Sequence, residues 1–171
     1  MNSYIADPLS RKKIRQLVSK IRYAMGLSPE DYFDVVRFLE FYLHEVVPDF
    51  HIEVVPIVEM PNQYALTFPK TKCIKIREDV YDGAIAGNAR DRFTIAHEIG
   101  HLWLHRPGNL ALARNSSKED IPAYKDPEWQ ANTFAAELLL PPEGTQGLLL
   151  DEIVARYGVS YQVGNIQIKN R

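Results

Sequence analysis

Apolar residues recur at helical spacing through the first part of the chain. They predict a first helix that opens at Asp7-Pro8, ends near Tyr23 and buries one stripe of side chains, namely Ile14, Leu17, Val18 and Ile21. The run Ser28-Pro29-Glu30-Asp31 combines an N-cap residue, a proline for the first helical position and acids for the first turn. A second helix is therefore expected from there to Val47, and Pro48 ends it.

The middle of the chain changes to the period of β-strands. Pro56 indicates that the first strand is an edge strand or is interrupted. In the third strand, Ile74 and Ile76 would face the core, which places Cys73 on the opposite face. We interpret Cys73 as an inert small strand residue and assign it no role. The three expected strands are short segments rich in β-branched and aromatic residues, separated by turn residues, at 52–58, 64–68 and 72–76.

Helical spacing returns in the second half of the chain. One helix is expected from Ala89 to His105, and another from Asp126-Pro127-Glu128 to Pro141-Pro142, with a polar loop at 114–125 between them. The tail, 148–169, predicts a pair of short helices around a turn at Gly158. The predicted fold is α+β, with a small mostly antiparallel or mixed sheet packed on the 89–105 helix. We expect a single domain, made of N-terminal helices (1–48), a core (49–142) and a C-terminal helix pair (143–171).

Composition narrows the class of protein. With 171 residues, 46% of them hydrophobic and 25% charged, the chain suits one globular domain. Its formal net charge of -2 supplies no overall basic field for nucleic acid. A single cysteine fits a reducing compartment. Neither a signal peptide nor a membrane-spanning stretch is recognisable, so we expect a cytoplasmic protein with no membrane partner.

The residues with catalytic potential are concentrated in His97-Glu98-Ile99-Gly100-His101, an H-E-x-x-H sequence inside the 89–105 helix. Two histidines four residues apart lie about 40° from each other around a helix, so both rings can reach one metal ion. Glu98 projects beside them and could take a proton from an attacking water. Apolar residues cover most of the helix, and its polar stripe is expected to line a cleft: Arg90, Thr94, His97, Glu98, His101 and His105.

A zinc peptidase of this type needs a third protein ligand. The metzincin arrangement requires glycine and histidine where this chain has Leu104 and Pro107, so that class is excluded. An acid from a later segment is the alternative, and the candidates are Glu119, Asp120, Asp126, Glu128, Glu137 and Glu143.

Glu128 is the strongest candidate among these acids. It opens a helix whose small residues, Ala131 and Ala136, allow close approach to the H-E-x-x-H helix. Glu137 lies about 180° round that helix from it, and Asp126 is better placed to cap the helix. The alternative role for Glu128 is that of a first-turn acid complementing the helix dipole.

Two further polar residues are expected near the ligands. His105 lies one turn beyond His101, and each turn rises about 5.4 Å, so three successive histidines do not converge on one ion. A supporting or structural role is expected for it. Asn132 could orient a ligand histidine through the free ring nitrogen.

Two blocks of the sequence resemble the ImmA/IrrE family of metallopeptidases. They are 92–101 (RFTIAHEIGH), continued by Leu104-His105, and 128–141 (EWQANTFAAELLLP). The resemblance implies a gluzincin-like fold and one Zn²⁺ per chain on His97, His101 and Glu128, with Glu98 as general base. It also implies a protein of bacteria, phages or other mobile elements that cleaves or inactivates a helix-turn-helix repressor, and some relatives resemble toxins of toxin–antitoxin pairs.

The resulting hypothesis is a zinc-dependent endopeptidase acting on a helix-turn-helix repressor or antitoxin-type protein. A substrate segment is expected to align along the strand Lys72–Arg77 as a sheet edge. Tyr124 and Arg90 are open candidates for stabilising the oxyanion. One alternative is a non-catalytic repressor- or antitoxin-binding protein, or a toxin component, with a vestigial or structural metal. A second is a DNA-binding regulator using the tail, where Lys169 and Arg171 are the only cations of the second expected helix.

Overall fold

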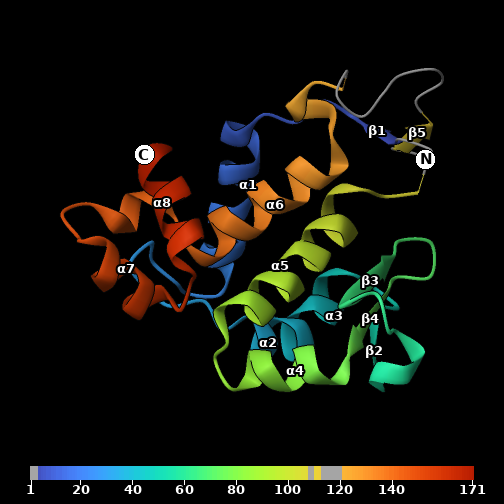
Figure 1. Ribbon diagram of the computed structural model, residues 1–171. Helices are drawn as coiled ribbons and strands as arrows, with labels where there is room; N and C mark the ends of the chain where they lie inside the picture. The colour runs from blue at the N-terminus through green and yellow to red at the C-terminus, as the bar shows by residue number, and fades with distance from the viewer. Residues whose placement is uncertain (1–3, 108–109, 113–120) are drawn as a thin grey trace.

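The computed structural model describes residues 4–107, 110–112 and 121–171. The architecture is α+β, as the sequence predicts. Helix α5 (Ala89–Leu104) runs through the middle of the molecule, helix α6 (Pro127–Leu139) packs along it, and a three-stranded sheet lies against its other side (Figure 1). The candidate acids Glu119 and Asp120, with most of the predicted polar loop, lie outside the described residues.

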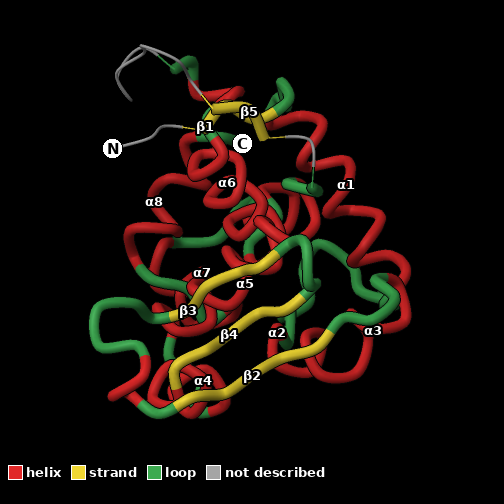
Figure 2. The backbone as a smooth tube through the Cα atoms, turned by 90° about the vertical axis from the view of Figure 1, so that its right-hand side faces the viewer, coloured by secondary structure: helices red, strands yellow, loops and turns green. Residues whose placement is uncertain are grey.

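The sheet is mixed and consists of β2 (His51–Val55), β3 (Ala65–Phe68) and β4 (Cys73–Arg77) in the order β2-β4-β3. Strand β2 runs parallel to β4, and β3 runs antiparallel to it. Figure 2 shows the three strands side by side with the helices behind them. Ile74 and Ile76 are fully buried on the helix side, which is the face predicted for them.

The expectation that Lys72–Arg77 forms a sheet edge is wrong. Strand β4 is the central strand and pairs on both sides. Its near-continuous burial agrees with its place between two other strands. The edges are β2 and β3. Strand β2 ends at Val55, directly before Pro56, which agrees with the edge position that this proline predicts.

Helix α1 (Arg11–Ala24) begins at the N-cap Ser10, whose hydroxyl accepts a hydrogen bond from the Lys13 backbone N–H at 3.3 Å. The helix packs on α6 through Ile14, Val18 and Ile21.

The second predicted helix starts later and is less regular than the sequence indicates. The Asp31 carboxylate accepts hydrogen bonds from the Ser28 backbone N–H at 2.7 Å and hydroxyl at 2.8 Å, so Ser28 closes a turn and caps no helix. Asp34 is the actual N-cap. Three short pieces follow: α2 (Val35–Arg37), a π-helical segment η1 (Phe38–Tyr42) and α3 (Leu43–Val46).

Two features have no counterpart in the sequence analysis. Helix α4 (Glu78–Ile85) follows β4 directly, and strand β1 (Tyr4–Ala6) pairs antiparallel with β5 (Leu110–Leu112). Strands of this length carry no readable alternation, and their pairing joins segments that lie far apart in the sequence. Short 3-10 turns complete the described structure at Ile57–Glu59, Ala123–Lys125 and Pro142–Thr145.

The C-terminal helix pair is confirmed as α7 (Leu150–Tyr157) and α8 (Tyr161–Lys169). Gly158 adopts a left-handed conformation between them, with φ of 59°. The buried Arg92 of α5 donates to the carbonyls of Tyr157, at 2.8 Å, and Gly158. It also donates to the Phe33 carbonyl at 2.8 Å, so one side chain joins α5, the N-terminal region and the C-terminal pair.

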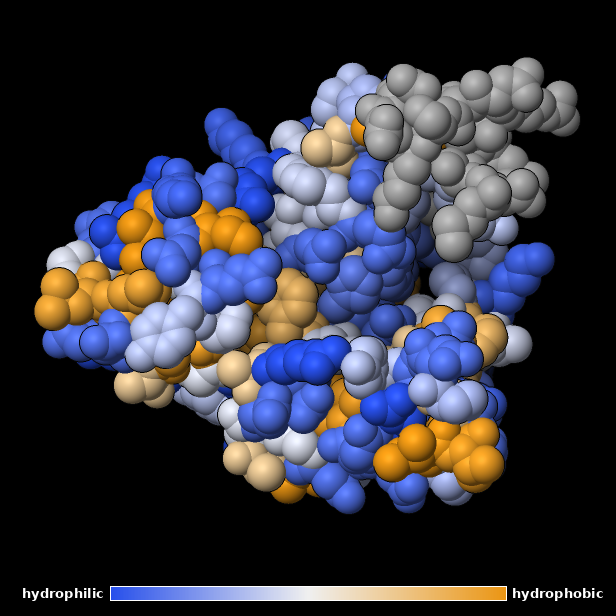
Figure 3. All heavy atoms as spheres, in the orientation of Figure 1, coloured by the Kyte–Doolittle hydropathy of each residue, from blue (hydrophilic) through white to orange (hydrophobic). Residues whose placement is uncertain are grey.

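None of the described helices is long and apolar enough to cross a membrane. Figure 3 shows hydrophobic side chains gathered over α7 and α8 and over the 57–59 turn. The surface where α5 meets α6 is mainly hydrophilic in the same view.

Candidate metal centre

Helix α5 brings His97 and His101 together on one face. Asn88 caps the helix by accepting hydrogen bonds from the backbone N–H groups of Arg90 and Asp91, and Ile95, Ala96 and Ile99 anchor the helix in the core. The two histidines are one turn apart, and their Nε2 atoms lie 2.9 Å from each other.

Helix α6 reaches this face because the two helices approach closely at Gly100. A Cβ atom added to Gly100 would lie 3.2 Å from the Ala131 Cα and 3.1 Å from the Phe134 ring, which is closer than side chains normally pack. Asp126 caps α6 by accepting from the Glu128 backbone N–H at 3.0 Å. Glu128 therefore stands in the first turn of α6, where its carboxylate faces the two histidines.

The Glu128 carboxylate completes a three-donor cluster. Its Oε2 lies 3.4 Å from the His97 Nε2, and its Oε1 lies 3.3 Å from the His101 Nε2. Ligands at about 2.0–2.1 Å from a tetrahedral ion lie roughly 3.3 Å from one another. The cluster of two imidazoles and one carboxylate therefore fits a zinc-like ion with a fourth position left over.

The charges in this cluster support one another. Hydrogen bonds to His101, the larger cause, and to His97 hold the pKa of Glu128 well below its ordinary value. The carboxylate is therefore ionised. Burial lowers the pKa of His97, but the hydrogen bond to Glu128 and the charge of Glu98 outweigh it, and the net shift is upward.

Each histidine is held through its other ring nitrogen. The His97 Nδ1 lies 2.9 Å from the Asn132 Oδ1, the contact that the sequence suggested. Because an amide oxygen only accepts, this Nδ1 donates, and the Nε2 is the ring nitrogen that faces the cluster.

A longer chain of hydrogen bonds holds His101. Its Nδ1 lies 2.9 Å from the His105 Nδ1, and the His105 Nε2 lies 3.0 Å from the Gln130 Oε1. Burial lowers the pKa of His105 to about 4, so that ring is neutral. The Gln130 amide donates to the carbonyls of Asp7, at 2.8 Å, and Tyr124, at 2.9 Å.

These two backbone carbonyls determine the hydrogen-bonding role of the His101 Nδ1. They turn the Gln130 oxygen toward His105, which must then donate from Nε2 and accept at Nδ1. His101 therefore donates from its own Nδ1, and its Nε2 is the ring nitrogen that faces Glu128. The sequence indicated a supporting role for His105, but it did not identify Gln130.

Glu98 lies beside the cluster and is 8% exposed. The Thr67 hydroxyl of β3 is 2.6 Å from its Oε2 and 2.9 Å from its backbone carbonyl oxygen. No hydrogen bond among the described residues uses its Oε1. Thr67 is a second contact that the sequence did not reveal, because nothing in a strand pattern shows which helix residue a strand side chain will meet.

The remaining candidate acids lie elsewhere. Glu137 is buried on the side of α6 that faces α1, where Arg11 donates to it at 2.8 Å and Arg15 at 2.9 Å. Glu143 is exposed and 4.0 Å from Arg15. The structure thus brings together His97, His101 and Glu128, with Glu98 in the same turn of α5, and places Glu137 and Glu143 beside Arg11 and Arg15. Asp126 caps α6. The metal-binding and catalytic roles stay predictions.

Comparison with known proteins finds partial matches to a phage protein and to a solved structure. A relative, the "Uncharacterized immunity region protein 2" of Bacillus phage phi105, is 32% identical over 85 residues, which are 46% of this chain and 51% of the relative. The match therefore spans about half of the relative's length. A solved structure described as a Mycobacterium tuberculosis transcriptional regulator superposes with a TM-score of 0.58 at 14% identity, over 89% of this chain and 54% of that one. At that identity, the likeness concerns the fold alone.

Residues 84–169, half of the chain, match the family model of the IrrE N-terminal-like domain, a peptidase family. This segment contains α5, α6 and the C-terminal helix pair, and therefore every member of the cluster described above. The chain belongs to the peptidase family of the IrrE N-terminal-like domain.

Proposed function

We propose that this protein is a cytoplasmic zinc-dependent endopeptidase in which His97, His101 and Glu128 hold the metal and Glu98 is the general base. The observation that carries the proposal is the convergence of the three donors, each histidine having its Nδ1 already engaged. A structural zinc site would favour four protein ligands, whereas three donors leave a position for water or substrate.

A bound zinc ion would supply Lewis-acid polarisation of the scissile carbonyl and a more acidic water. Glu98 would accept the proton of the attacking water and deliver it to the leaving amine. The hydrogen bond from Thr67 occupies the Oε2 of Glu98, so the Oε1 would carry the proton. The hydrogen bond from Thr67 would thus keep the carboxylate in one orientation while the Oε1 accepts and releases the proton.

Strand β3 is the sheet edge that contacts α5. An extended substrate segment would pair with this edge, because β4 has no unpaired side. Such a segment would pass close to Thr67, whose hydroxyl reaches Glu98.

The proposed substrate is a helix-turn-helix repressor or an antitoxin-type protein. The relative named for a phage immunity region supports a setting in which a repressor is regulated. A direct role of the tail in DNA binding has less support. Gln167 of α8 is fully buried and donates to the Leu140 carbonyl, and Arg171 donates to the Thr145 backbone carbonyl at 2.6 Å, so both side chains hold the tail against the domain.

The test is cleavage of purified helix-turn-helix repressors and antitoxin-type proteins, followed by mass spectrometry of the products. Glu98→Gln keeps the volume and the acceptor for Thr67 but removes the base, so the rate should fall by about 10²–10⁴-fold with zinc content unchanged. Glu45→Gln, an exposed substitution, is the matched control and should retain full activity.

Two outcomes would change the proposal. Full activity of Glu98→Gln would contradict the assigned base. Tight binding of the repressor without cleavage by the zinc-loaded wild type would favour the alternative, a repressor- or antitoxin-binding protein or toxin component whose metal is structural.

A further inference from the structure

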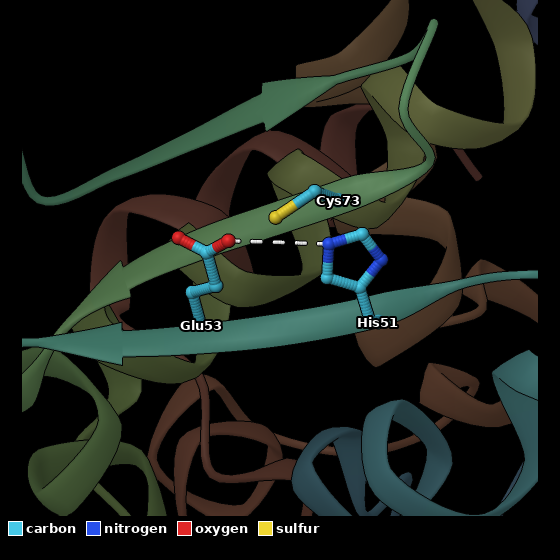
Figure 4. Close-up of side chains that lie close together, drawn as sticks. All are labelled: His51, Glu53 and Cys73. Carbon is cyan, nitrogen blue, oxygen red and sulfur yellow. Dashed lines mark ion pairs between the residues drawn. The ribbon is translucent and has the colours of Figure 1, made fainter.

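A second group of metal-ligand side chains lies on the sheet face that the helices leave uncovered. Strands β2 and β4 are in parallel register, with His51 opposite Cys73 and Glu53 opposite Lys75. Because successive side chains alternate between faces, His51, Glu53 and Cys73 all project outward. Figure 4 shows the imidazole, the carboxylate and the thiol converging above the boundary between the two strands.

The three donors are close enough to share an ion. One donor atom from each of His51, Glu53 and Cys73 lies within 4.8 Å of the other two, and the His51 Nε2 is 3.9 Å from the Glu53 Oε1. Cys73 is 4% exposed and forms the floor of the group, whereas the side chains of His51 and Glu53 are about half exposed. These two can therefore rotate above the thiol and close to the roughly 3.3 Å spacing of tetrahedral ligands.

The donor set indicates which ion would bind. A thiolate with an imidazole and a carboxylate is the mixture that suits zinc, while Mg²⁺ and Ca²⁺ prefer oxygen ligands. Ionised Cys73 and Glu53 would balance a divalent charge. Lys75 lies 3.1 Å from the Glu53 Oε2, which leaves the Oε1 directed toward His51.

We propose that His51, Glu53 and Cys73 form a second zinc site on the outer face of the sheet. It would bridge the edge strand β2 and the central strand β4 and leave a fourth position for water. The zinc content would then be two per chain under zinc-replete conditions, one more than the sequence implies, and Cys73 would have a role that the sequence did not indicate. The site is separate from the α5–α6 cluster, which uses the opposite side of the sheet through Thr67.

The test uses Co²⁺ as a spectroscopic probe in the reduced 171-residue protein. The chain contains one cysteine, so a thiolate-to-cobalt charge-transfer band in the near ultraviolet reports on Cys73 alone. We expect the band to appear on titration, to be displaced by Zn²⁺, and to persist in Glu128→Ala, where the α5–α6 cluster is disabled.

Variants of the three donors distinguish a site made by all three side chains from Co²⁺ binding by the Cys73 thiol alone. Cys73→Ser should abolish the band. His51→Ala and Glu53→Gln, both at half-exposed side chains, should each weaken Co²⁺ binding at this site by at least about tenfold. Circular dichroism checks the folding of every variant.

The proposal is overturned if the folded wild type gives no band, or if His51→Ala and Glu53→Gln bind Co²⁺ as tightly as the wild type. A band that disappears in Glu128→Ala would overturn it as well. So would a band that grows with protein concentration, because the thiol would then be shared between chains.

Discussion

The two three-donor clusters differ in what holds their side chains in place. In the α5–α6 cluster, His97 is fixed by Asn132 and His101 by the chain through His105 and Gln130 to two backbone carbonyls. In the β2–β4 cluster, the ion pair of Lys75 with Glu53 is the main outside contact, and both exposed ligands face solvent.

The two clusters also differ in whether their acidic ligands are already ionised without a metal. The pKa of Glu128 is held low by the histidines, whereas burial, followed by the charge of Glu53, raises the pKa of the Cys73 thiol. The α5–α6 cluster is therefore organised before a metal arrives, while the β2–β4 cluster must rotate two side chains and release a proton. We expect tight binding at the first cluster and weaker, exchangeable binding at the second.

The largest expected effect is the loss of zinc affinity when one ligand of the α5–α6 cluster is removed. Zinc sites with four ligands contribute about 10–16 kcal/mol, roughly 3 kcal/mol per ligand, so His101→Ala should weaken tight zinc binding by more than about a hundredfold. His51→Ala should leave it unchanged. Competition with a chromophoric chelator measures both, and equal losses in the two variants would remove the distinction.

Zinc should also stabilise the fold, mainly through the α5–α6 cluster. At a hundred times its dissociation constant, a ligand raises the free energy of unfolding by about 2.7 kcal/mol. Denaturant unfolding with and without zinc measures the increment. Glu128→Ala should lose most of it, and Glu143→Ala, which removes an exposed acid outside the cluster, should keep it. An increment that survives in Glu128→Ala would place the tight site elsewhere.

The hydrogen bonds that link His101 through His105 to Gln130 can be tested without substituting a metal ligand. Gln130→Met keeps the length of the side chain but removes the acceptor for His105, so His101 loses its fixed orientation. Zinc affinity should fall about 10–100-fold, as measured by the same chelator competition. Gln146→Met, at an exposed position, should change nothing. An unaltered affinity in Gln130→Met would show that the chain to the backbone carbonyls has no part in metal binding.

The smallest effect concerns Lys75, which holds one oxygen of Glu53. Lys75→Met frees that carboxylate, so Co²⁺ binding at the β2–β4 cluster should strengthen, by less than about fivefold because exposed ion pairs are weak. The thiolate band measures the change. Weaker binding in this variant would mean that Lys75 orients Glu53 for the metal instead of competing with it.

The sequence was most informative where local rules and chemistry agree. Helix α5 begins at Ala89 as predicted, since helical spacing and the H-E-x-x-H motif coincide there. Asp126 caps α6 and places Glu128 in its first turn, which follows from local capping rules. The left-handed Gly158 between the C-terminal helices is likewise a local preference. These features depend on residues within a few positions of one another.

The strand order and the residues that support the cluster depend on contacts between segments distant in the sequence, which no local pattern predicts. The order β2-β4-β3, which makes β4 the central strand, depends on how the chain crosses over the sheet. Thr67 meets Glu98 and Gln130 meets His105 only because the sheet and α6 pack on α5. The sequence by itself determined the helix that bears the histidines and the acid most suited to join them. The tertiary structure decided which side chains hold them, because hydrogen bonds between distant segments form only once the core has brought those segments together.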